Sequence, residues 1–307
     1  MDTLLNERAL HCFHVVAQQG GVRAGADHLG MDPATVSRAV TRLAEEAGAV
    51  LLERHGRGVR PTEAGELLLQ HYRWLRMQQE DTLTRMEELK GMKWGTIDLA
   101  LGEGFVEDLH DGALSTFCRQ HPGVVVNQHV AGADDILRMV ADGDVHLGLT
   151  YNLHPDPRVQ SRGAWTQPLR LMVPPGHPLL GNPPVTLAQV AAHPIGLLQG
   201  VFGVRQLVDL AMERAQVRLV PQLTSNSFTA LKAFVGAGLG VAFMPAFAAR
   251  RAIQAGTMLP VALDDSQLAQ AQAHIIIRRG RRLSACAGNL MECMARTMHA
   301  FGAEPAD

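Results

Sequence analysis

The sequence predicts two domains of different classes, a helix-rich N-terminal domain and a two-lobed α/β C-terminal domain, joined by a long helix. Three observations predict this division. Short amphipathic helical patterns and a glycine-containing hairpin fill residues 1–66, residues 62–92 keep a helical periodicity without proline, and residues after 94 alternate between strand and helix patterns. A chain of 307 residues also exceeds one ordinary domain, so we expect at least two folding units.

The stretch Met31–Glu46 predicts the helix around which the N-terminal domain is organised. Asp32 is a suitable N-cap, and Pro33 falls at the first helical position, where its missing N–H costs nothing. Residues spaced four and three apart form one apolar stripe of Val36, Val40 and Leu43. The remaining face is short, polar and cationic, with Thr35, Ser37, Arg38, Thr41 and Arg42.

Two shorter helices are expected before it. The first is an amphipathic helix around Leu10, Phe13, Val16 and Ala17, and the second spans 22–29 and ends at Gly30. Two helices, a tight turn and a third helix with outward hydroxyls and guanidinium groups predict a helix-turn-helix, whose third helix lies in the major groove of DNA. The alternative interpretation is that Arg38 and Arg42 belong to a merely solvated helix face.

A basic hairpin follows the third helix. Residues 50–52 are expected to form a short apolar strand, and residues 53–60 a hairpin with three arginines, Arg54, Arg57 and Arg60. Its glycines permit unusual backbone angles and close approach, while its arginines can reach phosphates or the minor groove. We interpret it as a wing, which favours DNA binding over a solvated surface.

At this point the chain resembles the LysR-type transcriptional regulators. The resemblance runs through 9–13, 34–38 with Leu43, and 52–65, in one order and spacing, although Gly25 stands where the family usually has Ala. It implies a DNA-binding regulator in which Pro33 and Thr35 fix the start of the recognition helix. Base or phosphate contacts are then expected from Ser37, Arg38, Thr41 and Arg42, and backbone contacts from Arg54, Arg57 and Arg60.

The net charge does not by itself indicate a nucleic-acid-binding protein. The chain carries −2, and residues 1–66 hold seven Arg, no Lys and nine Asp or Glu. The prediction depends instead on where the arginines lie, because five of them fall in the recognition helix and wing. We expect a steep salt dependence and two copies of the chain at each double-stranded promoter site.

Other features exclude several classes of protein. The sequence has neither a run of about eighteen apolar residues nor a signal peptide, so we expect a cytoplasmic protein without a membrane partner. Its four scattered cysteines are interpreted as structural thiols, and its histidines lack metal-ligand spacing, so no metal and no cofactor are expected. Residues 236–240 resemble a dinucleotide loop but lie between a helix and a strand, the wrong order for phosphate binding. With no catalytic motif either, we expect no catalytic residues and no enzyme activity.

The connecting helix carries a heptad-like seam at steps of four and three. Its members are Leu68, Tyr72, Leu75, Gln79, Thr82, Met86 and Leu89. We interpret the seam as a dimerisation surface, with a homodimer or homotetramer as the assembly, and Gly91 and Gly95 as a hinge. The alternative is that the seam packs against its own chain. The predicted domains are therefore 1–66, a linker helix over 67–92, and 93–307.

The remaining residues predict two α/β lobes. Strands are expected at 96–101, 124–129, 145–150, 169–173, 195–198, 219–223, 241–244 and 274–277, and helices at 106–120, 134–142, 187–192, 203–215, 227–237, 245–255 and 283–301. The order resembles the periplasmic-binding-protein-like effector domain of LysR regulators. Lobe I is expected at about 95–163 and 269–303, and lobe II at about 164–268.

Small ligands of such sheets bind beyond the carboxyl ends of strands, where helix N-termini aim N–H groups at the cleft. The expected effector-binding residues are Gly102, Glu103, Gly104, Phe105, Thr150, Tyr151, Gln199, Phe202, Gly203, Ser225, Asn226 and Ser227. A small carboxylate or zwitterion suits residues 224–227, although plain N-capping by Ser225 or Ser227 is an alternative. An acid at Glu103 would repel an anion, so we expect it either to point to solvent or to match an ammonium group.

The sequence as a whole predicts an oligomeric transcriptional regulator that binds promoter DNA and responds to a small molecule between two α/β lobes. The alternatives are a solute-binding protein, which would have no use for residues 1–66, and an unrecognised α/β enzyme with an appended helix-turn-helix.

Overall fold

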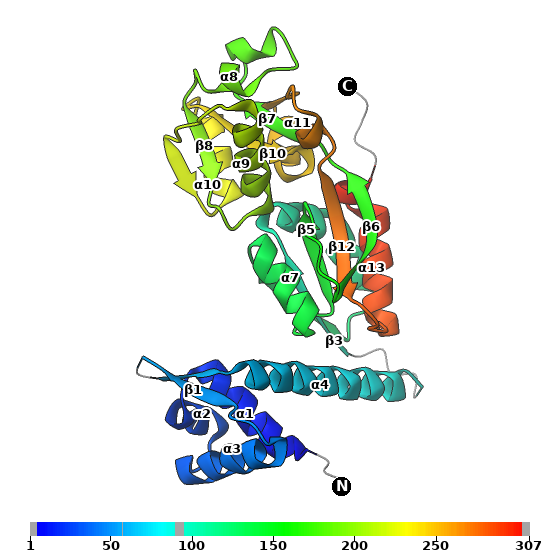
Figure 1. Ribbon diagram of the computed structural model, residues 1–307. Coiled ribbons are helices and arrows are strands. Elements are labelled where there is room, and N and C mark those ends of the chain that lie inside the picture. The colour runs from blue at the N-terminus through cyan, green and yellow to red at the C-terminus, as the bar shows by residue number, and fades with distance from the viewer. Residues whose placement is uncertain (1–4, 57, 90–94, 303–307) are drawn as a thin grey trace. The chain divides into compact units, whose positions relative to one another are not determined.

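The computed structural model describes residues 5–56, 58–89 and 95–302 (Figure 1). Its contacts divide the chain into two units, Met1–Leu83 and Thr84–Asp307, which are described separately below. Among the described residues, no helix is long and apolar enough to cross a bilayer.

Three helices form the first unit where the sequence predicts them: α1 (Glu7–Gln19), α2 (Val22–Leu29) and α3 (Pro33–Ala47). Each ends at a glycine in the left-handed conformation, Gly20, Gly30 or Gly48. Apolar side chains from all three helices meet in one core. A Cβ at Gly25 would lie 2.9 Å from Cγ2 of Val16, so this departure from the family pattern lets α2 approach α1 closely.

The wing is an antiparallel pair of β1 (Leu52–His55) and β2 (Gly58–Pro61). The apolar strand predicted at 50–52 is wrong, because pairing begins only at Leu52. Upstream of that residue, the carbonyl groups accept hydrogen bonds from Thr62 instead of a partner strand. A Cβ at Gly58 would lie 2.4 Å from the carbonyl oxygen of Gly20, so the wing strand packs tightly on the end of α1.

The long helix α4 (Glu63–Leu89) corrects part of the predicted seam. Leu68 and Tyr72 are buried in the core of their own unit, and Leu75 packs against it, so the self-packing alternative holds for these three. Farther along the helix, Met86 is exposed. The side chain of Leu89 and the hinge residue Gly91 lie outside the described residues.

Lobe I is built on a mixed sheet with the order β4-β3-β5-β12-β6. Its strands are β3 (Gly95–Leu101), β4 (Val124–Val130), β5 (Leu147–Tyr151), β6 (Val159–Thr166) and β12 (Gln272–Arg278). The first three strands run parallel, as predicted, and β12 pairs antiparallel with β5 and β6.

Helices cover both faces of the lobe I sheet. Along β3, Ala100 packs in the cluster beneath α7 (Ala133–Asp142), whereas Leu99 and Leu101 face the other core, which includes residues of α13 (Ala285–Thr297) (Figure 1). The helix predicted at 106–120 forms, and its backbone stays helical through α5 (Val106–Asp108), the π-helical η2 (Leu109–Leu114) and α6 (Ser115–Gln120). A 3-10 turn, η1 (Glu103–Phe105), lies between β3 and this helix and contains Glu103.

Lobe II is built on a second five-stranded sheet with the order β11-β7-β10-β8-β9. Its strands are β7 (Leu169–Val173), β8 (Ile195–Leu198), β9 (Leu223–Ser225), β10 (Val241–Pro245) and β11 (Leu259–Val261). Its helical segments are η3 (Pro178–Leu180), α8 (Leu187–Val190), α9 (Gly203–Ala215), α10 (Phe228–Gly236), η4 (Ala246–Ala249), α11 (Arg250–Gln254) and α12 (Ser266–Ala269).

Three local predictions in the second unit are wrong. The strand predicted at 219–223 begins only at Leu223, because Pro221 has no N–H to donate to a neighbouring strand. The single helix predicted at 245–255 consists of the end of β10, a 3-10 turn and α11. The helix predicted at 283–301 ends at Thr297 as α13, and a separate 3-10 turn, η5 (His299–Phe301), follows it. Strands β6 and β11 were not predicted.

Candidate DNA-binding surface and interlobe cavity

The face of α3 that points away from the core of the first unit is exposed. The Asp32 carboxylate accepts a hydrogen bond from the Thr35 backbone N–H at 3.1 Å, so the predicted cap forms. The predicted apolar stripe of Val36, Val40 and Leu43 is buried. This burial directs the predicted DNA-contacting residues outward, and all six of α3 are exposed: Pro33, Thr35, Ser37, Arg38, Thr41 and Arg42.

Two of the predicted DNA-contacting arginines are paired with acids on the same surface. The Arg42 Nε donates to Glu46 at 2.8 Å, one helical turn away, and the Arg60 Nε donates to Glu53 across the wing at 2.6 Å. Arg54 is exposed on β1, and Arg57 lies outside the described residues. Exposed ion pairs of this kind are weak, so a phosphate can replace the acid at small cost.

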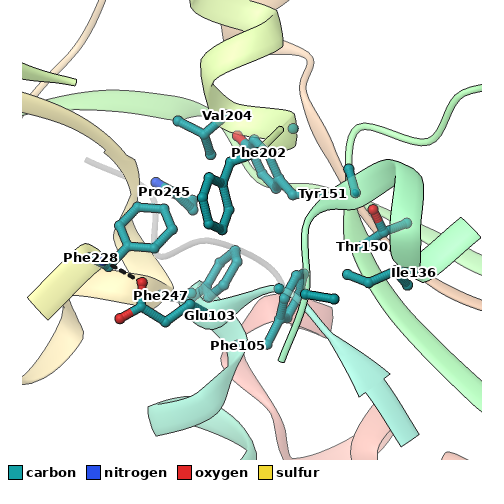
Figure 2. Close-up of a pocket in the computed structure, with 15 residues that line it drawn as sticks. Glu103, Phe105, Ile136, Thr150, Tyr151, Phe202, Val204, Phe228, Pro245 and Phe247 are labelled. Carbon is teal, nitrogen blue, oxygen red and sulfur yellow. Dashed lines mark hydrogen bonds between the residues drawn. The ribbon is translucent and has the colours of Figure 1, made fainter. Parts of the chain in front are cut away.

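The second unit holds a small cavity between its lobes, with a volume of about 30 Å³. Its lining comes from both lobes and is shown in Figure 2. The lining residues are Gly102, Glu103, Gly104, Phe105, Ala131, Ala133, Ile136, Thr150, Tyr151, Phe202, Gly203, Val204, Phe228, Pro245 and Phe247. This volume holds one or two water molecules, so the lobes are closed on each other.

Eight of the twelve predicted effector-binding residues line this cavity: Gly102, Glu103, Gly104, Phe105, Thr150, Tyr151, Phe202 and Gly203. The other four, Gln199, Ser225, Asn226 and Ser227, do not. Seven lining residues were not predicted: Ala131, Ala133, Ile136, Val204, Phe228, Pro245 and Phe247. Two of them, Val204 and Phe228, directly follow the predicted residues Gly203 and Ser227, so adjacency to those residues is the signal that could have found them.

Aromatic rings dominate the cavity wall. Four of the nine phenylalanines and one of the two tyrosines of the chain line it. The ring of Phe247 lies 5.0 Å from that of Phe105 and 6.3 Å from that of Tyr151, measured between centroids. Only two side chains of the described lining, Glu103 and Thr150, bring a charge or a hydroxyl other than the Tyr151 phenol, which donates to the Gln167 carbonyl at 2.6 Å.

Glu103 crosses from lobe I to the beginning of α10 in lobe II. Its carboxylate accepts a hydrogen bond from the Ser227 hydroxyl at 2.7 Å. It also accepts one from the Phe228 backbone N–H (Figure 2). The alternative that Glu103 points to solvent is therefore wrong. The positive end of the α10 dipole, where we expected an effector carboxylate, already holds the carboxylate of the chain itself.

Two more acids on the same helical stretch also reach lobe II. Glu107 accepts from the Lys232 ammonium at 2.5 Å, and Asp111 pairs with Arg251, with Oδ2 3.0 Å from Nε. The hydrogen bond from Arg251 lowers the pKa of Asp111 below its usual value. With Glu103, these acids are spaced four residues apart, so one face of the stretch bridges the lobes three times.

On the opposite side of the cavity the lobes touch through their backbones. The Ala133 N–H donates to the Val201 carbonyl at 3.0 Å. Cβ atoms built at Gly132 and Gly203 would lie 2.7 Å from the Val201 oxygen and 2.2 Å from the Tyr151 oxygen, respectively. Glycine is therefore required at both positions for the lobes to meet in this arrangement.

Two family models match the chain. The model described as "LysR substrate binding domain" matches residues 91–299, and the model described as "Bacterial regulatory helix-turn-helix protein, lysR family" matches residues 8–66. Together they cover both units of the structure.

Known proteins of similar sequence or structure match this chain over nearly its whole length. The RuBisCO operon transcriptional regulator of Allochromatium vinosum is 28% identical over 288 residues, which cover 93% of this chain and 94% of that protein. The SDS degradation transcriptional activation protein of Pseudomonas sp. (strain ATCC 19151) is 27% identical, with 94% and 97% covered. A variant of full-length OxyR from Pseudomonas aeruginosa superposes with a TM-score of 0.70 at 17% identity, covering 97% of this chain and 100% of that one. Full-length CbnR in complex with its target DNA superposes with a TM-score of 0.60 at 20% identity, covering 95% and 99%.

Proposed function

Because this chain belongs to the LysR family of transcriptional regulators, which bind promoter DNA and small-molecule effectors as oligomers and are not enzymes, we propose which of its residues do so. The observation that carries the DNA-binding proposal is the orientation of α3, whose apolar stripe is buried and whose hydroxyls and guanidinium groups face outward. Residues 1–66 form the DNA-binding domain, 67–92 the linker helix and 93–307 the effector domain. A regulator of promoter DNA acts in the cytoplasm.

The recognition helix reads the major groove. Ser37, Arg38, Thr41 and Arg42 contact base edges or nearby phosphates, since guanidinium groups suit guanine and hydroxyls suit several bases. Pro33 and Thr35 fix the start of the helix, with Thr35 held by the Asp32 cap. The wing arginines Arg54, Arg57 and Arg60 hold the DNA backbone without reading sequence.

Arg38 provides the sharpest test of this assignment. Its Nη2 lies 3.4 Å from the Thr35 hydroxyl, with no carboxylate partner among the described residues. Arg38→Ala is expected to reduce the preference for operator over non-specific DNA by about 1–3 kcal/mol, measured by fluorescence anisotropy at fixed salt. Arg119→Ala, which removes the same charge from the exposed surface of α6, is the matched control. An unchanged preference in the Arg38 variant would remove this residue from base readout.

The oligomer forms through the part of α4 that its own unit leaves uncovered. Leu67, Trp74, Leu83 and Met86 are exposed large apolar side chains on this helix. Such side chains favour burial against a second copy, in a homodimer or as part of a homotetramer. Trp74→Glu is expected to weaken association in sedimentation velocity experiments, and an unchanged oligomeric state would place the contact elsewhere.

The effector binds in the cavity between the lobes. Of the two predicted classes, a small carboxylate and a zwitterion, the zwitterion suits the cavity better, because Glu103 already occupies the donors at the beginning of α10. The N-terminus of α9 supports it: Phe202 provides no side-chain cap within the described chain, and Gly203 and Val204 at this end line the cavity. A thermal-shift screen of metabolites on the full chain tests the site, since a ligand of the folded state raises its melting temperature. Val204→Phe, which fills the cavity, must abolish the response.

A further inference from the structure

The interlobe cavity combines one carboxylate with a wall of aromatic rings, which is the chemistry that recognises an organic cation. We propose that the effector carries an ammonium or alkylammonium group, which binds among these rings beside Glu103. This inference rests on the proposed function of the cavity and names the ligand class that the cavity selects.

Glu103 is held by groups that do not neutralise its charge. Its two hydrogen-bond donors, the Ser227 hydroxyl and the Phe228 N–H, are both neutral groups. No Lys, Arg or His is present in the described lining of the cavity. Lys232 lies on α10, the helix that begins at Phe228, but its ammonium group pairs with Glu107. A carboxylate offers about four lone-pair positions, so Glu103 can keep both donors and still face a cation. A negative charge in an apolar cavity favours a ligand that neutralises it.

The aromatic rings of the lining provide a second attraction for a cation. Phe105, Phe228 and Phe247 are buried beside the cavity, and Phe202 is partly buried there. Figure 2 shows the rings of Phe202, Phe228 and Phe247 on the same side of the cavity as Glu103. The faces of aromatic rings carry negative partial charge and attract cations without requiring hydrogen-bond donors. Alkyl groups on an ammonium also remove apolar surface from water against the same rings.

An anion is disfavoured at the beginning of α10. The donors at the beginning of α10 are already occupied by Glu103, so a ligand carboxylate placed there meets a like charge and must displace a tethered one. A zwitterion avoids this conflict by placing its carboxylate elsewhere. Thr150 suits that role, because it is only 3% exposed and its hydroxyl has no hydrogen-bond partner within the described residues. Gly203 and Val204, at the uncapped end of α9, line the same cavity.

The small size of the cavity also determines how a cation would act. The cavity has room for about one or two water molecules, and a tetramethylammonium ion is larger than that, so we expect its binding to move the lobes. Glu103 connects the two lobes, and a cation bound beside it therefore biases the contact between them. The charge of the ligand would therefore affect the arrangement of the two lobes through the Glu103 carboxylate.

The test compares small ligands of similar shape and different charge on the full chain. The probes are tetramethylammonium and benzyltrimethylammonium as cations, tert-butanol as the neutral compound and pivalate as the anion, at matched ionic strength. We expect the two cations to raise the melting temperature by several degrees, whereas tert-butanol and pivalate leave it unchanged. In Glu103→Gln, the amide oxygen can still accept from the Phe228 N–H, and the amide nitrogen can donate to the Ser227 hydroxyl, while the negative charge is lost. In this variant the cations are expected to bind at least tenfold more weakly by calorimetry. Glu292→Gln removes the same charge from the exposed surface of α13 and should leave cation binding unchanged.

Three outcomes would overturn the inference: no shift with either cation, a cation shift that survives Glu103→Gln, or an equal shift with pivalate. Val204→Phe separates this failure from failure of the proposed function. A neutral or anionic ligand whose effect is lost in Val204→Phe would place the effector in the cavity and refute only its positive charge. An effector response that persists in Val204→Phe would refute the cavity itself as the effector site.

Discussion

Replacing Gly203 by alanine should force the two lobes of the effector domain apart. Gly203 begins α9 in lobe II, and a Cβ at this position would lie 2.2 Å from the carbonyl oxygen of Tyr151 at the end of β5 in lobe I. Both sides of the contact are backbone, so no side chain can rotate away to relieve it. The lobes must separate by about 1 Å at this point to restore an ordinary carbon–oxygen contact.

The cost follows from what the separation breaks. The Ala133 N–H, which donates to Val201 at 3.0 Å, is next to this contact and would be pulled from its acceptor. Overpacking of a tight contact costs about 1–3 kcal/mol. For a unit of this size, each kcal/mol lowers the melting temperature by about 2–4 °C. We therefore expect a decrease of about 2–12 °C.

Hydrogen exchange at the Ala133 amide provides the direct measurement, because this N–H bridges the lobes and exchanges when they open. Gly200→Ala is the matched control, since no described atom lies within 4 Å of its Cβ and its backbone is outside the left-handed region. Protection at Ala133 should fall in the Gly203 variant and not in the control. Equal protection and equal melting temperatures in the two variants would refute the idea that this glycine sets the distance between the lobes.

Three further predictions concern other parts of the chain. Glu46→Gln frees Arg42 from an exposed ion pair of 2.8 Å, so DNA affinity should rise about two- to fivefold with a steeper salt dependence, and weaker binding would contradict this. Burial, together with repulsion from Arg73, lowers the pKa of His14 to about 4. Because the unfolded chain takes up the proton near pH 6.5, the N-terminal unit should lose about 1–2 kcal/mol of stability as pH falls from 6.5 to 4, after allowance for solvent screening. The loss should disappear in His14→Gln, as followed by hydrogen exchange in α1. Gly288→Ala, inside α13 with no described atom within 4 Å of its Cβ, should stabilise the effector domain by about 0.5–1 kcal/mol in calorimetry, and a lower melting temperature would contradict the open space around it.

The helices of the first unit were predictable because their signals are local. Caps, glycine terminators and apolar spacing act within three or four residues of each other, and α2 and α3 begin where these signals place them. The same reasoning located most of the loops that line the interlobe cavity, because strand ends and helix beginnings meet at one edge of a sheet. Strand β6 and the displaced β9 were less predictable, since pairing partners distant in sequence decide where a strand forms.

The apolar pattern of α4 identified a buried seam but not what buries it. A heptad spacing is the same whether the partner is a second copy or the helix α1 of the same chain. Only the packed structure assigns Leu68 and Tyr72 to the core of their own unit and leaves Trp74 exposed.

The sequence alone determined the order of elements, the outward-facing arginines of the recognition helix and the class of regulator, because these depend on local periodicity and on motifs with fixed spacing. The tertiary structure decided the chemistry of the cavity. Glu103 and Phe228 are 125 residues apart, and nothing local indicates that the carboxylate of one binds the N–H of the other. That contact exists only because two separately folded lobes bring their edges together, and the contacts between those edges are set by the packing of the whole domain.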